Sequence, residues 1–375
     1  MVDINTPPKP DTGWSKEICL LENAKVIPPT VSALVQEAGV LDSNGEHCEH
    51  GALWRGARAM TVAPKVPEEN IPIERLSGNW LYAGVLWVHF GHFLAESTSR
   101  LWAIDKLKSQ LDGIIFIPKR PAVGEQLQTM NNTFMELLGC DLPIKVINAP
   151  TKVERLHVPG QGFGLGPMVS GTDEFRSYIH NNFGSNVEPN GPEKLYISRS
   201  ALSTKKGGII GEEYLENYLL KEGYEIFHPQ KHDMPTQIAH YKAARKIIAL
   251  DGSALHLFGF VGTKDQHVAM IPRRTSNVHK NISKQLEVFC GRTPFVPKCM
   301  KTDWIVEARG RPDRKSVGEL NMERLSKKLA RYEFISENTK WESVFWRRRN
   351  RAIRHIEKTS GEKYIPIHRE NVEGK

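Results

Sequence analysis

The residues best suited to catalysis in this chain of 375 residues lie in the stretch 80–107, WLYAGVLWVHFGHFLAESTSRLWAIDKL. A helix that begins near residue 90 turns by about 100° per residue, so His92, Glu96 and Arg100 fall on one stripe. Imidazole and carboxylate groups transfer protons, and a guanidinium group binds anions. The stripe therefore predicts a catalytic helix face. The alternative is a solvated face with a Glu96–Arg100 ion pair.

A second set of candidate residues follows the apolar run 195–198, LYIS, which is typical of a buried strand. Arg199 comes directly after this run, and Lys205 and Lys206 lie in the next loop. A guanidinium group at the carboxyl end of a parallel strand is well placed to bind a diphosphate through two hydrogen bonds. We favour this phosphate site over a surface arginine, because the position and the neighbouring charges agree.

A third set lies in the turn after the apolar run 246–250 and at the start of the next helix. Small residues there would let a ligand approach the backbone, and the helix start offers free N–H groups to a phosphate. Asp251 could accept hydrogen bonds from ribose or sugar hydroxyls, whereas Ser253 has a simpler interpretation as the helix cap. Gln237, on the preceding helix, could face the same crevice. The candidates in the turn and helix are Asp251, Gly252, Ser253 and His256.

We expect no metal ion in this chemistry. An Asp-x-Asp pair, which would hold Mg²⁺ or Mn²⁺, does not occur near a predicted strand end. A leaving diphosphate would then be stabilised by arginine, lysine and helix termini alone. The cluster EHCEH at 46–50 contains metal-ligand residue types, but they are too crowded to close on one ion, and no second Cys/His pair follows at a suitable spacing. We favour an exposed loop there.

The first half of the chain predicts strands that alternate with helices, which indicates an α/β layer fold. Residues 1–75 are rich in proline and predict irregular structure. The glycine-rich stretch 159–167 lacks the spacing of a dinucleotide fingerprint, and we interpret it as a flexible loop beside a ligand cleft. The strand candidates are the apolar runs 82–88, 113–118, 144–147 and 155–158.

A second α/β series follows the linker candidate 186–192, NVEPNGP. Two such series predict two Rossmann-like domains that face a cleft. The strand candidates are 195–198, 224–227, 246–250 and 267–271, and the helix candidates are 212–222, 235–242 and 255–260. The predicted domains are an α/β domain at 1–190, a phosphate-binding domain at 191–300 and a helical, basic tail at 301–375.

The tail contains WESVFWRRRNRAIRHIEK at 341–358, with an aromatic half before a basic half. A basic amphipathic helix of this kind can lie on an anionic membrane. The other interpretation is a helix packed by Trp341, Phe345 and Trp346 with its arginines in water. We favour packing, because the aromatic residues precede the basic run instead of alternating with it.

The composition excludes several classes of protein. Hydrophobic residues make up 39% and charged residues 25%, as in a soluble globular protein. No apolar run approaches the ~20 residues that span a bilayer, and the first residues lack the apolar core of a secretory signal. Five cysteines predict free thiols in a reducing compartment. The net charge of +8 suits anionic ligands.

Three parts of the sequence resemble glycosyltransferase family 61, the DUF563 group. They are HFGHFLAESTSRLW at 89–102, LYISR at 195–199 and the segment 212–260. The matching positions are His92, Ser198, Arg199, Glu212, Gln237 and 251–255. The departures are Gly211 in place of Asn, Thr236 in place of Glu, Asp251 in place of His, Ser253 in place of Ala, and a lysine pair where a second arginine is usual. The change at Asp251 leaves no catalytic histidine at that position of the turn.

The resemblance implies an inverting, metal-independent glycosyltransferase of GT-B architecture. It implies a nucleotide-sugar donor bound by the second α/β series, a glycan or lipid-linked acceptor bound by the first, and no cofactor. Bacterial relatives act in capsular or surface polysaccharide synthesis, so we expect a cytoplasmic enzyme. Contact with the inner membrane through the basic tail remains an alternative. Nucleic acid is not expected as a partner, since aromatic and basic residues do not interleave across a predicted sheet.

An inverting transfer needs one group to take the proton of the acceptor hydroxyl. We predict His92 as this base, because its ordinary pKa suits the task, and Glu96 as the group that orients it. Glu96 as the base is the alternative. Two other functions stay open: a non-catalytic module that binds anions or nucleotides, and a pyruvyl or phosphoryl transferase on a similar scaffold.

Overall fold

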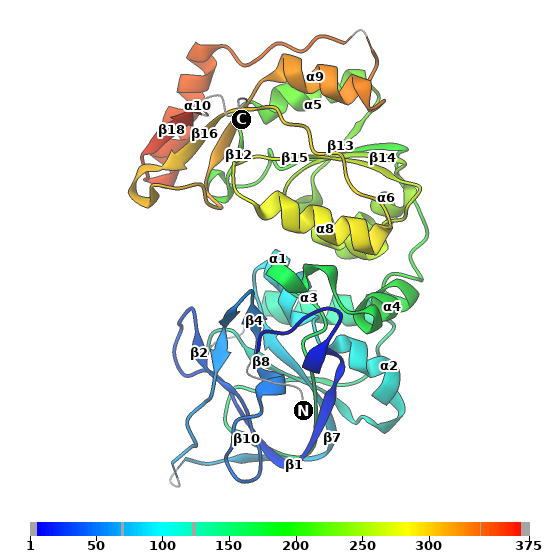
Figure 1. Cartoon of the computed structure of the whole chain (residues 1–375), viewed down its shortest axis with the longest axis vertical. Helices are drawn as coiled ribbons and strands as arrows, with labels where there is room; N and C mark the ends of the chain where they lie inside the picture. The colour runs from blue at the N-terminus through cyan, green and yellow to red at the C-terminus, as the bar shows by residue number, and fades with distance from the viewer. Residues whose placement is uncertain (1–5, 69–70, 122–124, 338, 369–375) are drawn as a thin grey trace. The chain divides into compact units, whose positions relative to one another are not determined.

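The computed structural model describes residues 6–68, 71–121, 125–337 and 339–368. The chain divides into two compact units, Met1–Asn186 and Val187–Lys375 (Figure 1). Both contain strands and helices, which confirms the predicted α/β class.

A six-stranded sheet, in the order β3-β1-β10-β7-β8-β9, forms the centre of the first unit. Strands β10, β7, β8 and β9 run parallel, and β1 and β3 join them in antiparallel pairs. Every residue of β8 is buried, as expected for a strand covered on both faces. The strands are β1 (Ile18–Ile27), β3 (Gly39–Leu41), β7 (Glu74–Leu86), β8 (Gly113–Pro118), β9 (Ile144–Val146) and β10 (Thr151–Pro159).

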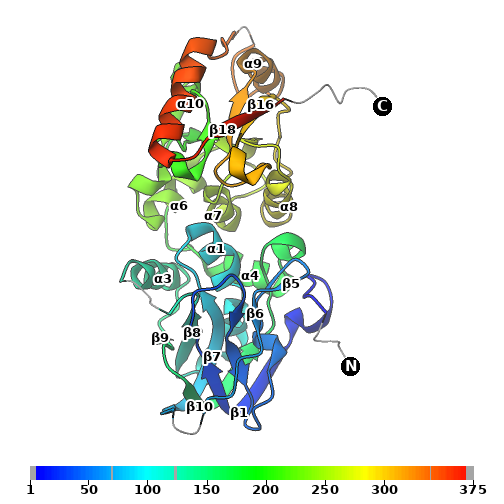
Figure 2. The same ribbon diagram turned by 90° about the vertical axis from the view of Figure 1, so that its left-hand side faces the viewer.

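The helices of this unit include three that gather at the end of the sheet where β7 leads into α1 (Figures 1 and 2). These are α1 (Phe90–His92), α3 (Glu125–Leu137) and α4 (Asp173–Asn182), and α2 (Ile104–Leu107) is the fourth. Four two-residue strands complete the described part of the unit: β2 (Gln36–Glu37), β4 (Trp54–Arg55), β5 (Arg58–Ala59) and β6 (Thr61–Val62).

The prediction of irregular structure for residues 1–75 is wrong. β1 has ten residues and pairs with β10 along most of its length. Its sequence mixes Glu22, Asn23 and Lys25 into an apolar run, because only the last part of the strand is well buried. Polar residues at those positions remove the alternation from which strands are recognised.

The second unit contains a four-stranded parallel sheet in the order β13-β11-β14-β15, which confirms the strands predicted there. Helices α6, α7 and α8 lie on one side of this sheet and α5 and α9 on the other (Figures 1 and 2). The strands are β11 (Lys194–Ile197), β13 (Glu225–Phe227), β14 (Lys246–Leu250) and β15 (His267–Ile271). The helices are α5 (Glu212–Lys221), α6 (Met234–Ala243), α7 (Ala254–Val261), α8 (Val278–Cys290) and α9 (Met322–Arg331).

The predicted helical tail is only partly helical. It supplies α9 and α10 (Trp346–Ser360), but it also supplies three strands of a second sheet, in the order β12-β17-β16-β18. The pairings of β12 with β17 and of β16 with β18 join segments far apart in the sequence, so no local pattern predicts them. Leu325, Leu329 and Trp341 of the tail share one core with Tyr196 and Leu215. The strands are β12 (Gly208–Ile209), β16 (Met300–Val306), β17 (Val317–Leu320) and β18 (Tyr364–His368).

Two findings bear on the environment of the chain. Among the described residues, no helix has both the length and the apolar character needed to cross a bilayer. The five cysteines are all free thiols.

Candidate functional site

The chain leaves β7 and forms α1, followed by a π-helical turn, η3 (Phe93–Ser97), instead of the continuous helix that we predicted. Side-chain hydroxyl groups close this turn. Thr98 Oγ1 donates to the carbonyl of Leu94 at 2.7 Å, and Ser99 Oγ donates to the carbonyl of Glu96 at 2.8 Å. π-Helical turns are frequent at functional sites, and this one sets the direction of Glu96.

Glu96 contacts His92 on α1 and Arg55 on β4. Arg55 Nε lies 2.7 Å from Glu96 Oε1, and Arg55 Nη2 lies 2.8 Å from Oε2, so the guanidinium group binds both carboxylate oxygens. His92 Nδ1 lies 3.0 Å from Glu96 Oε2. The side chain of Glu96 is fully buried, whereas 27% of His92 and 26% of Arg55 stay exposed. His92 is therefore partly exposed to solvent, while the carboxylate of Glu96 that it contacts is buried.

The protonation of this cluster follows from its contacts. Burial by itself would raise the pKa of Glu96, but hydrogen bonds from His92 and Arg55 outweigh it and hold the pKa below its ordinary value. Glu96 is therefore an ionised acceptor. His92 Nδ1 lies 3.0 Å from Glu96 Oε2 and 3.1 Å from Arg55 Nη2, and because a carboxylate can only accept, we assign the Nδ1 proton to the bond with Glu96. The lone pair of a neutral His92 is then on Nε2, where it can accept a proton. This is the arrangement in which a carboxylate fixes the tautomer of a catalytic base.

The indole ring of Trp87 lies against the cluster. His92 stacks on it with the ring centroids 4.6 Å apart, and Arg55 Cζ lies 5.3 Å from its centroid. Lys119 Nζ lies 5.1 Å from the same ring and donates to two backbone carbonyls. Burial, helped by the charge of Arg55, lowers the pKa of Lys119 to about 8. The surroundings of His92 thus carry more positive than negative charge at neutral pH.

Arg100 does not contact Glu96, so the alternative of an exposed Glu96–Arg100 pair is wrong. The helix breaks before Arg100, and the buried guanidinium group donates to the carbonyls of Pro159, His50 and Ala52 at 2.9, 2.9 and 2.7 Å. Gly84 has a φ of 96°, and a Cβ there would lie only 3.0 Å from Arg100 Nη1, so glycine lets the guanidinium group cross β7. Arg100 holds the backbone that leads into β4.

The interpretation of 159–167 as a flexible loop is also wrong. Gln161 is fully buried, and its side chain bonds both the N–H and the carbonyl of Trp54. Gly162 N–H donates to the carbonyl of Ser99 at 2.9 Å, and Trp102 Nε1 donates to that of Gly160 at 3.1 Å. Glycine is needed at two of these positions, because a Cβ at Gly160 would meet the backbone of Trp14 and one at Gly162 would meet the ring of Trp102.

In the second unit, candidate residues lie at the carboxyl ends of β11, β14 and β15, which are neighbours in the sheet. Arg199 follows β11, Asp251 follows β14, and Arg273 follows β15. The Arg199 side chain packs over Gly252, where a Cβ would lie 2.8 Å from Arg199 Nη1. Glycine at position 252 therefore leaves room for the Arg199 side chain. A ligand that approaches this turn would contact Arg199 before the backbone of Gly252.

Glu212, the first residue of α5, positions the strand end that carries Arg199. Its Oε1 accepts hydrogen bonds from the backbone N–H of Arg199 at 2.7 Å, from the Tyr196 hydroxyl at 3.0 Å and from the Ser198 hydroxyl at 3.2 Å. Burial raises the pKa of Glu212 to about 7, although the bonds from Arg199 and Tyr196 act against it. Glu212 contributes less negative charge near Arg199 than an exposed carboxylate would.

The carboxylate of Asp251 interacts with two neighbouring arginines of the same unit. Its Oδ1 accepts from the backbone N–H of Arg273 at 2.7 Å, and its oxygens lie 3.7 Å from Arg273 Nε and 3.8 Å from Arg274 Nε. The Nε groups of Arg199 and Arg274 are buried and have no hydrogen-bond partner among the described residues. Buried donors without partners need an explanation, and a bound anion such as a diphosphate would supply one.

Two other predicted ligands are held by the fold. Gln237 Nε2 donates to the carbonyls of Pro229 and His232 at 3.0 and 3.1 Å, which closes the loop before α6. His256 Nδ1 bonds Gln285 Oε1 on α8. These contacts give both side chains a structural role at their positions.

The remaining predicted ligands are Lys205, Lys206 and Ser253. Both lysine side chains are exposed, and Lys206 contributes its carbonyl, which accepts from Arg199 Nη2 at 3.1 Å. Ser253 stands at the start of α7, but its side chain makes no capping hydrogen bond, so the interpretation as a helix cap is wrong.

The sequence did not predict four cationic residues that lie near these sites: Arg55, Lys119, Arg273 and Arg274. Arg273 and Arg274 follow the strand 267–271 as closely as Arg199 follows its own strand, so the same strand-end argument could have found them. Arg55 and Lys119 reach Trp87 only through the fold, and no local signal marks them.

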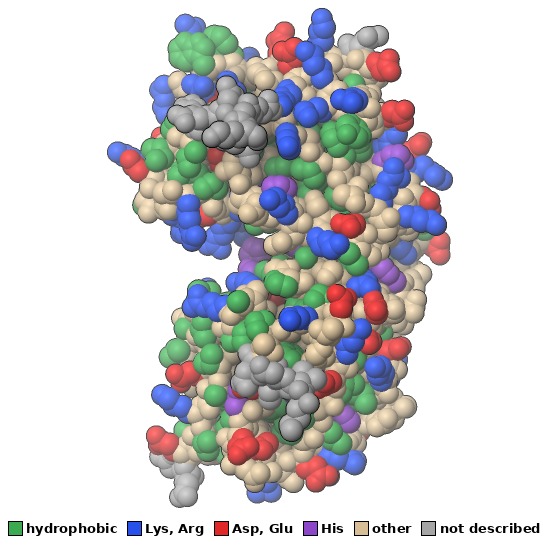
Figure 3. All heavy atoms as spheres, viewed as in Figure 1, with side chains coloured by type: hydrophobic (Ala, Val, Ile, Leu, Met, Phe, Trp, Pro, Cys, Tyr) green, Lys and Arg blue, Asp and Glu red, His purple; other side chains and the backbone are tan. Residues whose placement is uncertain are grey.

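The aromatic residues of the tail divide into two groups. Trp341 is buried and stacks on Tyr218, as the packing interpretation requires. Phe345 and Trp346 are 58% and 51% exposed, so for them that interpretation is wrong. Figure 3 shows apolar side chains beside basic ones over the beginning of α10.

The predicted exposed loop at 46–50 is wrong. Cys48 is buried and its neighbours are half-buried, with a short 3-10 helix, η2 (Glu49–Gly51), after it. The fold brings Cys19 of β1 to the same place, although it stands far away in the sequence.

Residues 90–268 match the family model described as Glycosyltransferase 61. The matched region contains His92 and Glu96 of the first unit and Arg199, Glu212 and Asp251 of the second. No curated protein matches the chain.

Proposed function

We propose that the chain, whose residues 90–268 match glycosyltransferase family 61, moves a sugar from a nucleotide-sugar donor to a glycan or lipid-linked acceptor. The observation that carries the proposal is the buried Glu96, which bonds both His92 and Arg55. We propose an inverting reaction without a metal ion, in the GT-B plan, with the acceptor on the first unit and the donor on the second.

On the donor side, the diphosphate would bind at the carboxyl ends of β11, β14 and β15. Arg199 and Arg274 would donate through Nε groups that have no hydrogen-bond partner among the described residues. Arg273 adds a third guanidinium group, whose Nε donates to the carbonyl of Asp251 at 3.0 Å. Guanidinium groups stabilise the charge that develops on the leaving diphosphate as the glycosidic bond breaks. Burial lowers the pKa of Arg273 to about 10, so it keeps its charge at neutral pH.

On the acceptor side, His92 Nε2 takes the proton of the attacking hydroxyl, and the hydroxyl oxygen attacks the anomeric carbon from the face opposite the diphosphate. Glu96 stabilises the imidazolium ion that forms, and Arg55 keeps Glu96 ionised and in place. Trp87 holds the plane of the His92 ring by stacking. Each of these side chains thus has one task in the proton transfer.

The wider setting is also a proposal. We place the reaction in surface or capsular polysaccharide synthesis and in the cytoplasm, where free thiols such as the five of this chain persist. We further propose that α10 touches an anionic membrane, because exposed Phe345 and Trp346 adjoin a basic surface hollow. The hollow is lined by Trp346, Arg347, Asn350, Arg351 and Arg354.

The experiment that tests the donor site is thermal unfolding with a panel of UDP-, GDP- and CMP-sugars. One nucleotide class should raise the Tm, since a ligand at about 100 times its Kd stabilises by about 2.7 kcal/mol. Arg199→Gln and Arg274→Gln should lose this rise, and Arg292→Gln, an exposed position, should keep it. Stabilisation by polyanions alone would contradict the enzyme and support a binding module.

A further inference from the structure

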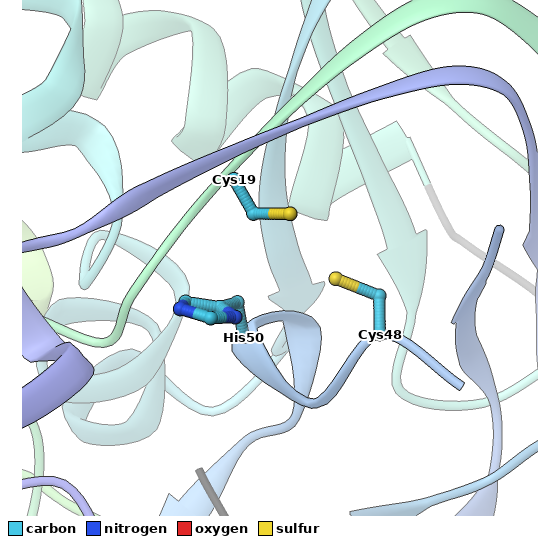
Figure 4. A group of neighbouring side chains, drawn as sticks. All are labelled: Cys19, Cys48 and His50. Atoms are coloured by element: carbon cyan, nitrogen blue, oxygen red, sulfur yellow. The ribbon is translucent and has the colours of Figure 1, made fainter. Parts of the chain in front are cut away.

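Three residues that the proposed reaction does not use lie together in the first unit: Cys19, Cys48 and His50. The two sulfur atoms and one imidazole nitrogen all lie within 4.8 Å of one another. Figure 4 shows Cys19 on one segment and Cys48 and His50 on another, with the two sulfur atoms directed toward each other. Two thiols and an imidazole are the ligand types that Zn²⁺ prefers in proteins.

We propose that Cys19, Cys48 and His50 bind a Zn²⁺ ion, with a water molecule as the fourth ligand. This ion would be separate from the transfer reaction, for which no metal is proposed. Each sulfur binds as a thiolate, so uptake of the ion releases the thiol protons to solvent.

The backbone around Cys48 suits a metal-bound sulfur. The N–H groups of His50 and Gly51 donate to that sulfur, and donors of this kind orient a ligating thiolate.

The imidazole of His50 is oriented as in many zinc sites. Its Nε2 lies 3.1 Å from Glu17 Oε2, so Nε2 donates to the carboxylate and Nδ1 keeps the lone pair for the metal ion. A carboxylate behind a ligating histidine fixes the ring and makes the nitrogen a stronger ligand. Trp14 packs edge-on against the same ring, with the centroids 5.8 Å apart.

The ion would have a defined structural effect. It would tie β1 to the segment 48–52, whose carbonyls at His50 and Ala52 accept hydrogen bonds from Arg100. That segment leads directly to Arg55, which holds Glu96. Zinc binding would therefore order the backbone that carries Arg55.

The test measures metal in the full-length chain, produced without a histidine tag and purified under reducing conditions. About one equivalent of zinc per chain is expected by elemental analysis. Replacement by Co²⁺ should give thiolate-to-cobalt charge-transfer absorption with the intensity of a tetrahedral site. Cys19→Ser and Cys48→Ser should each lose the tightly bound zinc, and Cys140→Ser, at a buried free cysteine of the same unit, should retain it.

Metal uptake by the wild-type chain tests the zinc site even if a variant fails to fold. A reduced, folded chain that takes up neither zinc nor cobalt would overturn the proposal. So would a Cys19–Cys48 disulfide that forms in air while added zinc leaves the Tm unchanged, because the pair would then be a redox couple. Donor binding and sugar transfer are measured separately, so failure here leaves the proposed function standing.

Discussion

At the scale of single residues, the central contact is the hydrogen bond from His92 Nδ1 to Glu96. A buried carboxylate is stable as an anion only when its oxygens are paired, and Arg55 and His92 together supply that pairing. Ionised Glu96 is a weak base, because its pKa is held below the ordinary value. In the proposed reaction, His92 therefore takes the proton of the acceptor hydroxyl, and Glu96 acts on His92 instead of on the substrate.

Glu212 gives a prediction about pH. Its pKa rises on folding from 4.5 to about 7, so between these values the folded chain keeps a proton that the unfolded chain has lost. Stability therefore falls as the pH rises through this window, by up to about 3 kcal/mol from this group. Glu212→Gln should remove that part of the fall. Urea unfolding at pH 5 and pH 8 measures it.

The control for this measurement is Glu213→Gln, an exposed neighbour on the same helix, which should unfold like the wild type at both pH values. The assignment of a raised pKa to Glu212 fails if Glu212→Gln and the wild type lose the same stability between pH 5 and pH 8.

Arg100 gives a prediction about stability. Lysine cannot reproduce a planar guanidinium group that donates to three separate carbonyls. Arg100→Lys should therefore lose about 3 kcal/mol of unfolding free energy, because buried carbonyls lose their donors. Chemical denaturation measures this loss. Arg75→Lys, on the exposed part of β7, is the matched control and should change little; equal stability of the two variants would refute the role of Arg100.

The sequence predicts the identity of His92 and Glu96, but not their pairing with Arg55. A periodic stripe depends on an unbroken helix, and the π-helical turn and the break before Arg100 change which residues meet. Arg199 was predictable because a strand end is a local signal. The engagement of Asp251 by Arg273 was not, since it depends on two strands being neighbours in the sheet.

At the scale of elements, α10 presents Phe345 and Trp346 to solvent next to its basic residues. Aromatic side chains insert at the level of lipid headgroups, and arginines bind anionic lipid. The double variant Phe345→Ser and Trp346→Ser should bind vesicles that contain anionic phospholipid at least about tenfold more weakly than the wild type. Co-sedimentation with vesicles measures the binding.

Two controls make this result specific. Neutral vesicles should bind the wild type weakly, and Tyr332→Ser, an exposed aromatic residue after α9, should bind anionic vesicles like the wild type. Membrane contact through α10 is contradicted if the double variant sediments as fully as the wild type.

The elements differ in how far they could be predicted. The parallel strands β8, β14 and β15 are continuous apolar runs, and their bounds agree with those predicted. β1 was missed because polar residues interrupt it, and the pairings β12–β17 and β16–β18 were missed because the paired strands are distant in the sequence. Local patterns find strands that are buried on both faces, but not strands defined by long-range pairing.

At the scale of the whole molecule, the proposed reaction divides two tasks between two units. In this proposal, proton transfer depends on His92 and Glu96 in the unit Met1–Asn186, and donor binding depends on arginines in the unit Val187–Lys375. The family match covers His92, Glu96 and Arg199, whereas Arg273 and Arg274 lie just beyond it. Substitutions of His92 or Glu96 should therefore alter turnover without altering the affinity for the donor.

The most direct test of this account measures sugar transfer and nucleotide-sugar binding in the same preparations of His92→Ala and Glu96→Gln. His267→Ala, an exposed residue at the opposite end of β15 from Arg273, is the control. The account predicts that both variants lose at least about 100-fold in turnover and bind the donor with the Kd of the wild type. Near-wild-type turnover of His92→Ala would contradict its role as the base.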